Sequence, residues 1–149
     1  MEAHYVRLAA MAVLSFIAMY MLMYAMVDRF ANVYPNLNQF YMAGMMAAPM
    51  VLIELALMGH MYPNKVLNVI IAIVSALAMI AFFVFIRQQT AIFDRQFLKS
   101  MIPHHAGAIL MCEKASIQDA EIRQLCSTIV SGQQSEIDRM KAILNRVEN

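Results

Sequence analysis

The segment Ser100–Cys112, SMIPHHAGAILMC, holds the residues of this chain best suited to bind a metal ion. Two adjacent histidines, His104 and His105, follow a proline, and a methionine lies on each side of them. Imidazole nitrogen combined with thioether sulfur suits copper, and thioethers select Cu(I) over harder ions. A structural zinc site normally offers more thiolates, so zinc is the less favoured ion.

A helix would bring these donors onto one face. At about 100° per residue, an arc of roughly 120° contains the whole set. Its members are Met101, His104, His105, Met111 and Cys112. Because proline breaks or restarts helices, we expect the preceding amphipathic segment, residues 87–100, to continue an upstream helix. A new helix is then predicted over about residues 102–116.

A second amphipathic pattern runs from Asp119, a candidate N-cap, to about Val147. Its apolar face is interrupted in the middle by two polar residues, Gln133 and Glu136, and Met140 lies on the same face. These three side chains are therefore the candidate metal ligands or polar partners on the second helix.

The two helices can form an antiparallel hairpin that turns near Gln118. In that register His104 lies opposite Gln133, and Met101 lies opposite Glu136. Burying such groups without partners would cost about 1–3 kcal/mol each, so they should serve one another or a ligand. The alternative to a metal site is a polar His–Gln–Glu core that fixes the helix register.

The two cysteines, Cys112 and Cys126, come close in the same register. In an oxidising compartment they can form a disulfide. In a reducing one they are either core residues or extra soft ligands.

No nucleophile paired with a base and no nucleotide-binding loop occurs in the sequence. No catalytic residue is therefore predicted, and we expect a binding protein rather than an enzyme.

Composition predicts the scaffold that carries this segment. Of 149 residues, 62% are hydrophobic and only 14% are charged, well above the apolar share of about 45–50% in soluble proteins. Three apolar stretches, residues 6–27, 39–61 and 66–86, reach the roughly 20 residues that cross a bilayer as a helix. The net charge of +1 gives no reason to expect nucleic-acid binding. We expect a membrane domain over residues 1–88 and a soluble, metal-binding hairpin over residues 89–149.

The second span carries a methionine stripe that ends on a carboxylate. An intramembrane carboxylate is costly and is a functional candidate by default. Packing is the plainer explanation for the methionines, and a copper path through an oligomer is the functional one. The candidates for such a path are Met42, Met46, Met50 and Glu54, with Met19 and Met23 in the first span.

The stretches FDRQFLKSMIPHHAGAILMCEKAS and LCSTIVSGQQSEIDRMKAIL resemble the family of domain of unknown function 305. The matching positions are Phe97, Met101, Ile102, His104, His105, Ala108, Met111, Gln133, Glu136, Ile137 and Met140. The resemblance implies a ferritin-like helical fold and copper binding through the His and Met positions. It also implies a role in copper handling or resistance, with copper chaperones as possible partners.

The fold class expected overall is all-α, with three transmembrane helices followed by a ferritin-like amphipathic hairpin. Since one hairpin cannot cover its own apolar faces, we expect two copies to form a four-helix bundle, or a higher homo-oligomer. The expected partners are therefore the lipid bilayer and the chain itself.

The expected location is a bacterial inner membrane, but the side of the hairpin stays open. Lysines and arginines near the spans are more frequent on the hairpin side, which favours a cytoplasmic hairpin. They are Arg29, Arg87, Arg95 and Lys99, against Arg7 and Lys65 on the other side. The resemblance to exported relatives implies the opposite side.

Overall fold

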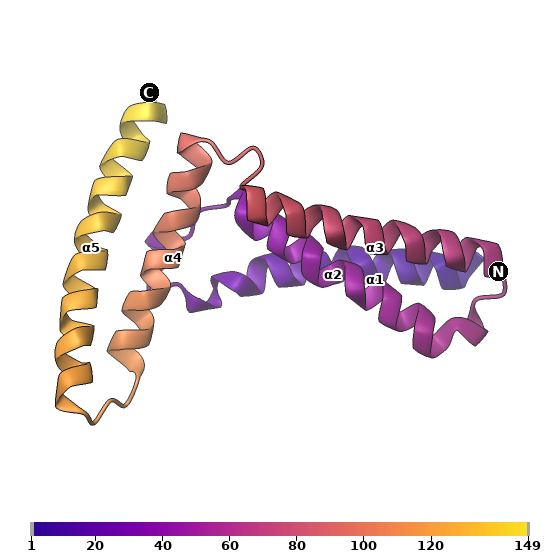
Figure 1. Cartoon of the computed structure of the whole chain (residues 1–149), viewed down its shortest axis with the longest axis horizontal. Coiled ribbons are helices and arrows are strands. Elements are labelled where there is room, and N and C mark those ends of the chain that lie inside the picture. Colours follow the sequence, from indigo (N-terminus) through magenta and orange to yellow (C-terminus); the bar gives the residue numbers. More distant parts are fainter. Residues whose placement is uncertain (1, 149) are drawn as a thin grey trace. The chain divides into compact units, whose positions relative to one another are not determined.

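The computed structural model describes residues 2–148 and is all-α over that range, as predicted. The long helices are α1 (Glu2–Leu22), α2 (Leu37–Met58), α3 (Lys65–Gln88), α4 (Asp94–Lys114) and α5 (Ala120–Glu148) (Figure 1). Three short 3-10 helices, η1 (Met23–Met26), η2 (Phe30–Asn32) and η3 (Gly59–Met61), lie in the connections. These elements form two compact units, which are described separately below.

The first unit comprises the chain up to Met23 together with Asn38–Ala91, and so holds α1, α2 and α3. Three segments are long and apolar enough to cross a membrane: Ala3–Met26, Leu37–Met61 and Lys65–Gln88. Most of their large apolar side chains are exposed on this unit, as expected where lipid rather than protein covers them. The three candidate spans predicted from hydropathy are thus helices in the structure.

Small residues on α2 allow close helix packing in the first unit. Ala43, Gly44 and Ala47 are buried, and a side chain added at Gly44 would overlap the ring of Phe82 on α3. Small residues let helix backbones approach closely, which drives association inside membranes.

Replacing Gly44 with leucine is therefore expected to weaken the packing of the first unit. Overpacking of this kind costs about 1–3 kcal/mol of unfolding free energy, since Phe82 must leave its position. Thermal unfolding in detergent measures the effect. Gly59→Leu is the control, because nothing lies within 4 Å of a side chain added at that position. Equal melting temperatures for the two variants would contradict the packing assignment.

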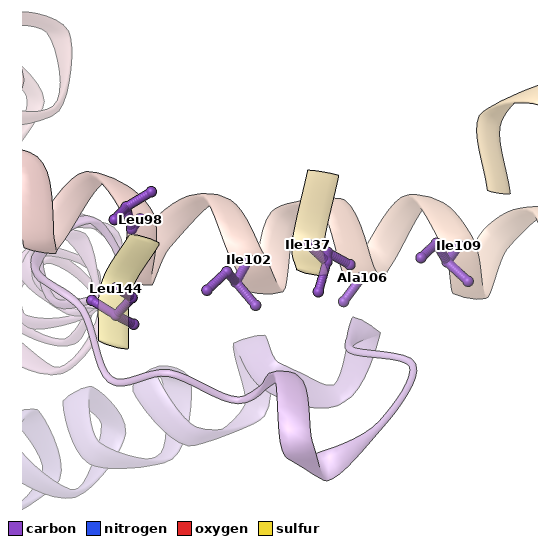
Figure 2. Packing of buried hydrophobic residues seen from close by; sticks show 6 residues of the cluster. All are labelled: Leu98, Ile102, Ala106, Ile109, Ile137 and Leu144. Atoms are coloured by element: carbon purple, nitrogen blue, oxygen red, sulfur yellow. The ribbon is translucent and has the colours of Figure 1, made fainter. Parts of the chain in front are cut away.

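The second unit consists of Tyr24–Leu37 and the chain from Ile92 onward. Helices α4 and α5 run side by side as an antiparallel hairpin (Figure 1). Its core consists of Leu98, Ile102, Ala106, Ile109, Ile137 and Leu144 (Figure 2). Val27 and Tyr34, from the connection between α1 and α2, pack against this core. The sequence assigned that connection to the membrane domain, whereas the structure places it with the hairpin.

The helix break predicted at Pro103 is wrong. Helix α4 runs through Pro103, and the break lies between Gln88 and Asp94, where Gln89 and Ala91 adopt left-handed backbone angles (φ 50° and 58°). Hydrogen bonds within the first unit hold this turn. The side chain of Gln89 donates to the carbonyl of Ile86 at 2.8 Å. Tyr41 also donates to the carbonyl of Thr90 at 2.9 Å.

Pro103 is tolerated inside α4 because its missing N–H is compensated. A proline leaves the carbonyl four residues earlier, here that of Lys99, without its helical donor. The side-chain amide of Asn36 donates to this carbonyl at 3.3 Å and to the carbonyl of Tyr34 at 2.9 Å. Asn36 itself is buried, with 5% of its surface exposed.

Replacing Asn36 with alanine should accordingly destabilise the hairpin unit by about 1–3 kcal/mol, the cost of leaving a buried polar group unpaired. Chemical denaturation followed by the helical circular dichroism signal measures this. Gln134→Ala removes one exposed hydrogen bond to Asp138 and should stay within about 0.5 kcal/mol of wild type. An Asn36→Ala protein as stable as the Gln134→Ala control would contradict this role.

Candidate metal centre

His105 occupies the inner side of α4 and is fixed at both ring nitrogens. Its exposed fraction is 8%. Nδ1 lies 2.9 Å from the carbonyl of Met101, and Nε2 lies 2.7 Å from Oε2 of Glu136 on α5. Because a carbonyl only accepts, Nδ1 must donate its proton to it. Nε2 faces the carboxylate, so the pair acts as a positioned imidazole–carboxylate unit.

His104 lies on the neighbouring face of α4 and is exposed to solvent. The two histidine rings are 6.0 Å apart between centroids and tilted by 63°. On the face of His104, Phe97 and Met111 are 50% and 54% exposed, and Met101 is half-buried. Spacings of four, three, four and three residues are those of a heptad seam. We call the five residues with this spacing the outer seam: Phe97, Met101, His104, Ala108 and Met111.

One predicted contact between the helices differs by about one turn, whereas Cys112 and Cys126 lie together as the predicted register requires. His105, not Met101, contacts Glu136, and no hydrogen bond joins His104 to Gln133 among the described residues. Gln133 and Met140 are half-buried, and Met140 packs against the hairpin core. The predicted ligand set is thus divided between the outer seam and the interface of α4 with α5.

The donors within one copy suit a soft ion better than a hard one. Among the described residues, no three His, Cys, Asp or Glu side chains come together as a metal-binding group. The remaining donors near the exposed imidazole are the thioethers of the outer seam, on Met101 and Met111. Imidazole with thioether is a donor set that copper, and Cu(I) in particular, accepts.

The two cysteines form a disulfide in the structure. Cys112, near the end of α4, is joined to Cys126, in the second turn of α5, with their Cα atoms 5.2 Å apart. The bond ties the two helices together at the end of the hairpin where the chain turns. In this state neither sulfur is a thiolate ligand.

The candidate residues of the first unit are half-buried or exposed within one copy. The buried residues of α2 are Tyr41, Ala43, Gly44, Ala47 and Val51, whereas Met46 is 41% exposed and Met42 and Met50 are half-buried. Met19 and Met23 are also half-buried. Glu54 accepts a hydrogen bond from the hydroxyl of Tyr62 at 3.0 Å. This partner was not predicted, and it satisfies the carboxylate near the end of α2.

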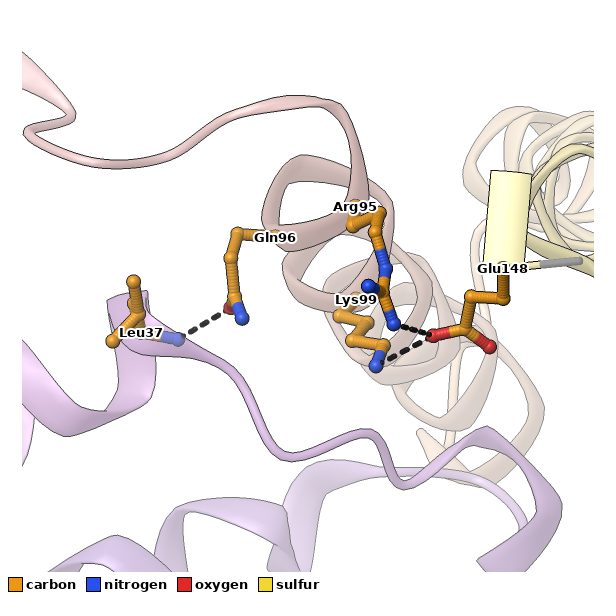
Figure 3. A network of polar contacts seen from close by, with 5 residues as sticks. All are labelled: Leu37, Arg95, Gln96, Lys99 and Glu148. Carbon is orange, nitrogen blue, oxygen red and sulfur yellow. Dashed lines mark hydrogen bonds and ion pairs between the residues drawn. The ribbon is translucent and has the colours of Figure 1, made fainter.

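A polar network at the other end of the hairpin also escaped the sequence analysis (Figure 3). Arg95 and Lys99 on α4 both contact Oε1 of Glu148, at 2.9 and 2.8 Å. The backbone N–H of Leu37 donates to Gln96 at 2.9 Å. Lys99, and then Arg95, hold the pKa of the Glu148 carboxyl below its usual value through these hydrogen bonds. The network closes the open end of the hairpin, opposite the disulfide.

The lowered pKa of Glu148 predicts a pH-dependent helix end. A carboxyl whose folded pKa is depressed stabilises the folded state at neutral pH, and the contribution is lost as pH falls through that folded value. Amide hydrogen exchange of the last turn of α5 should be faster in Glu148→Gln than in wild type at neutral pH. The difference should vanish on acidification. The same difference at both pH values would contradict the ion-pair assignment.

These observations define an all-α protein with three candidate membrane spans and a hairpin that presents imidazole and thioether groups on a partly exposed seam. Residues 82–144 match the family described as "Domain of unknown function (DUF305)". An uncharacterized protein of Acanthamoeba polyphaga mimivirus is 34% identical over 139 residues, which cover 91% of this chain and 89% of that protein. The chain therefore belongs to the DUF305 family. No solved structure matches.

The similarity to the mimivirus protein reaches beyond the hairpin. A match over 91% of this chain must include most of the three candidate spans as well as the family segment at residues 82–144. The relative is thus similar to this chain across both units, and not only in the part that bears the histidines.

Proposed function

We propose that this chain is an integral membrane protein that binds copper, preferentially Cu(I), on its hairpin and serves in copper handling or resistance. The observation that carries the proposal is the outer seam, where an exposed imidazole on His104 shares one helix face with the thioethers of Met101 and Met111. Membership in the DUF305 family agrees with this proposal without naming a function. The ion is cargo here, and no catalytic step is proposed.

His105 supports this site from the inner side of α4. The Met101 carbonyl fixes Nδ1 of His105, so the ring presents Nε2 in a fixed direction. Such second contacts to the imidazole are usual at metal sites. An ion at Nε2 would take the place of the contact between this nitrogen and Glu136. Glu136, with a side chain 61% exposed, can turn to solvent or to the ion when that happens.

We further propose that the outer seam is the contact between two copies. The hairpin core already uses one heptad seam on α4, formed by Leu98, Ile102, His105 and Ile109. A second seam of the same spacing, with half-exposed Phe97 and Met111, is available to another helix pair. On α5 Ile122 and Leu125 are 50% and 57% exposed. Two hairpins joined in this way form a four-helix bundle, with the ligands near the contact between copies.

The disulfide favours an oxidising environment for the hairpin, because such bonds persist in exported compartments and are rare in the cytosol. We therefore propose that the hairpin lies on the exported side of a bacterial inner membrane, contrary to the count of basic residues. Copper chaperones of that compartment are candidate donors. Protease treatment of spheroplasts should then remove a C-terminal tag, and complete protection of the tag would reverse the topology.

One observation favours a second candidate function. His105 and Glu136 satisfy each other at 2.7 Å, so the pair can also serve as a polar core that fixes the register of a structural hairpin. A copper-conducting oligomer is the third candidate. It would require several copies, with Met42, Met46 and Met50 facing a shared path, because these side chains are half-buried or exposed in one copy.

Titration of the detergent-purified protein with Cu(I), Cu(II) and Zn(II) tests the proposal. The comparison is between wild type and the double variant His104→Asn/His105→Asn. The other two histidines supply a matched control, His4→Asn/His60→Asn. We expect tight Cu(I) binding in wild type and in the control, and its loss in the hairpin variant. Equal weak binding by all three proteins would support the structural candidate instead.

A further inference from the structure

The end of the hairpin at which the chain turns carries a second group of soft donors, separate from the outer seam. Cys112 lies in the last turn of α4 and Cys126 in the second turn of α5, and both are half-buried. Their Cα atoms are 5.2 Å apart. The disulfide is thus partly accessible to solvent and to a reductant.

The hairpin holds these two residues close without depending on the bond between them. On α4 the preceding core residue is Ile109, which is 1% exposed, and on α5 Val130 packs against the same core. Each lies about one helical turn from its cysteine. The opposite end of the hairpin is held by Glu148 through Arg95 and Lys99. Reduction should therefore leave two thiols facing each other in a folded hairpin.

An open cavity lies beside the disulfide. It has a volume of about 530 Å³, and its lining includes both cysteines, Arg123, Ser127 and Ser131. A thiol reductant and a metal ion can both reach the sulfurs from this side. Two thiolates and one monovalent cation carry a net charge of −1. The guanidinium of Arg123 offsets this negative charge.

We propose that Cys112 and Cys126 form a redox-gated second binding site for Cu(I), closed as the disulfide and open as the dithiol. Thiolates are the softest ligands that a protein offers, and they select Cu(I). Metal–thiolate bonds are about 2.3 Å long, so two sulfurs that share one ion lie up to roughly 4.6 Å apart. Rotation of the two side chains reaches that separation from Cα atoms 5.2 Å apart.

The opening step is a thiol–disulfide exchange with a protein dithiol as reductant. One thiolate of the reductant attacks a sulfur of the Cys112–Cys126 bond, which breaks, and a mixed disulfide forms. The second thiol of the reductant then releases the chain. The reductant becomes a disulfide, and the chain gains two electrons and two protons. Binding of one Cu(I) by both sulfurs then releases those two protons.

Counting bound Cu(I) in the oxidised and the reduced protein tests the inference. The full-length protein is reduced with a dithiol reagent, and the reagent is removed under anaerobic conditions. The protein is then titrated with Cu(I) in competition with a chromogenic chelator. We expect reduced wild type to bind one more ion per chain than oxidised wild type. Cys112→Ser/Cys126→Ser should bind the oxidised number under both conditions. No gain on reduction of wild type would overturn the inference.

A repositioned thiol separates a built site from the general affinity of thiols for copper. The variant Cys126→Ser/Ser127→Cys keeps two thiols but turns one of them by about 100° around α5. Its extra ion should be bound at least tenfold more weakly than that of reduced wild type. Equal affinity would show that hairpin geometry contributes nothing and would overturn the inference.

The inference can fail independently of the proposed function. The double variant His104→Asn/His105→Asn lacks the outer-seam imidazole but keeps both cysteines, so its gain of one ion on reduction should persist. If oxidised wild type binds no Cu(I), the proposed function fails while the gain on reduction is still measurable. If oxidised wild type binds Cu(I) and reduction adds nothing, only the redox-gated site fails.

Discussion

Replacing His104 with asparagine should abolish tight Cu(I) binding while the protein unfolds at the wild-type temperature. Within one copy His104 is exposed and lies outside the hydrophobic core of the hairpin, so its loss removes a ligand and little packing there. The affinity for Cu(I) should fall by at least the roughly 10–100-fold that loss of a supporting contact costs at metal sites. Competition with a Cu(I) chelator measures the affinity, and circular dichroism measures the melt.

His105→Asn should instead change both quantities. His105 is buried and bonded to Met101 and Glu136, so its replacement removes a ligand and also two hydrogen bonds. We expect a loss of about 1–2 kcal/mol in unfolding free energy, since Glu136 is largely exposed and its contact with His105 is screened by solvent. Glu136→Gln keeps a hydrogen-bonding side chain and is the matched variant. Identical effects of His104→Asn and His105→Asn would contradict the two different roles.

The second large effect is expected in the hairpin core. Ile137 on α5 is fully buried, with an exposed fraction of 0%, and it packs against α4 near Ile102 and Ala106 (Figure 2). Replacing a buried isoleucine with alanine costs about 2–5 kcal/mol, from lost burial and from the cavity left behind. Ile137→Ala should therefore unfold the hairpin at much lower denaturant concentration.

Ile122→Ala is the control for that experiment. It makes the same chemical change on the same helix, but Ile122 is 50% exposed in one copy. In a monomeric preparation its cost should stay within about 0.5 kcal/mol. A comparable loss of unfolding free energy in both variants at low protein concentration would contradict the assignment of Ile137 to the hairpin core. A loss that appears in Ile122→Ala only at high protein concentration would support the proposed contact between copies.

The overall architecture could be predicted because it depends on hydrophobic pattern alone. Three uninterrupted apolar stretches predict three spans, and a periodic apolar face on each remaining helix predicts a hairpin. The proximity of Cys112 and Cys126 also followed, because they lie near the turn, where an error in register has little room to grow. Farther from the turn, a small error in register changes which residues of the two helices are predicted to face each other.

The pairing of His105 with Glu136 could not be predicted for that reason. A shift of one residue rotates a helix face by about 100°, enough to exchange His104 for His105 at the interface. Helix α4 tolerates Pro103 because Asn36 donates a hydrogen bond to the carbonyl of Lys99. Asn36 lies 63 positions before Lys99 in the sequence. The turn at Gln89 likewise depends on Tyr41 and Asn38, which belong to another helix. Such contacts between distant segments leave no local pattern in the sequence.

The most direct test of the central claim is X-ray absorption at the copper edge on the Cu(I)-loaded, full-length protein in its oxidised form. With Cys112 and Cys126 joined, any sulfur bound to copper must come from a methionine. The account predicts both nitrogen and sulfur scattering, with the sulfur lost in Met101→Leu/Met111→Leu and the nitrogen lost in His104→Asn/His105→Asn. Nitrogen and oxygen scattering alone, unchanged by either double variant, would contradict copper binding by the hairpin.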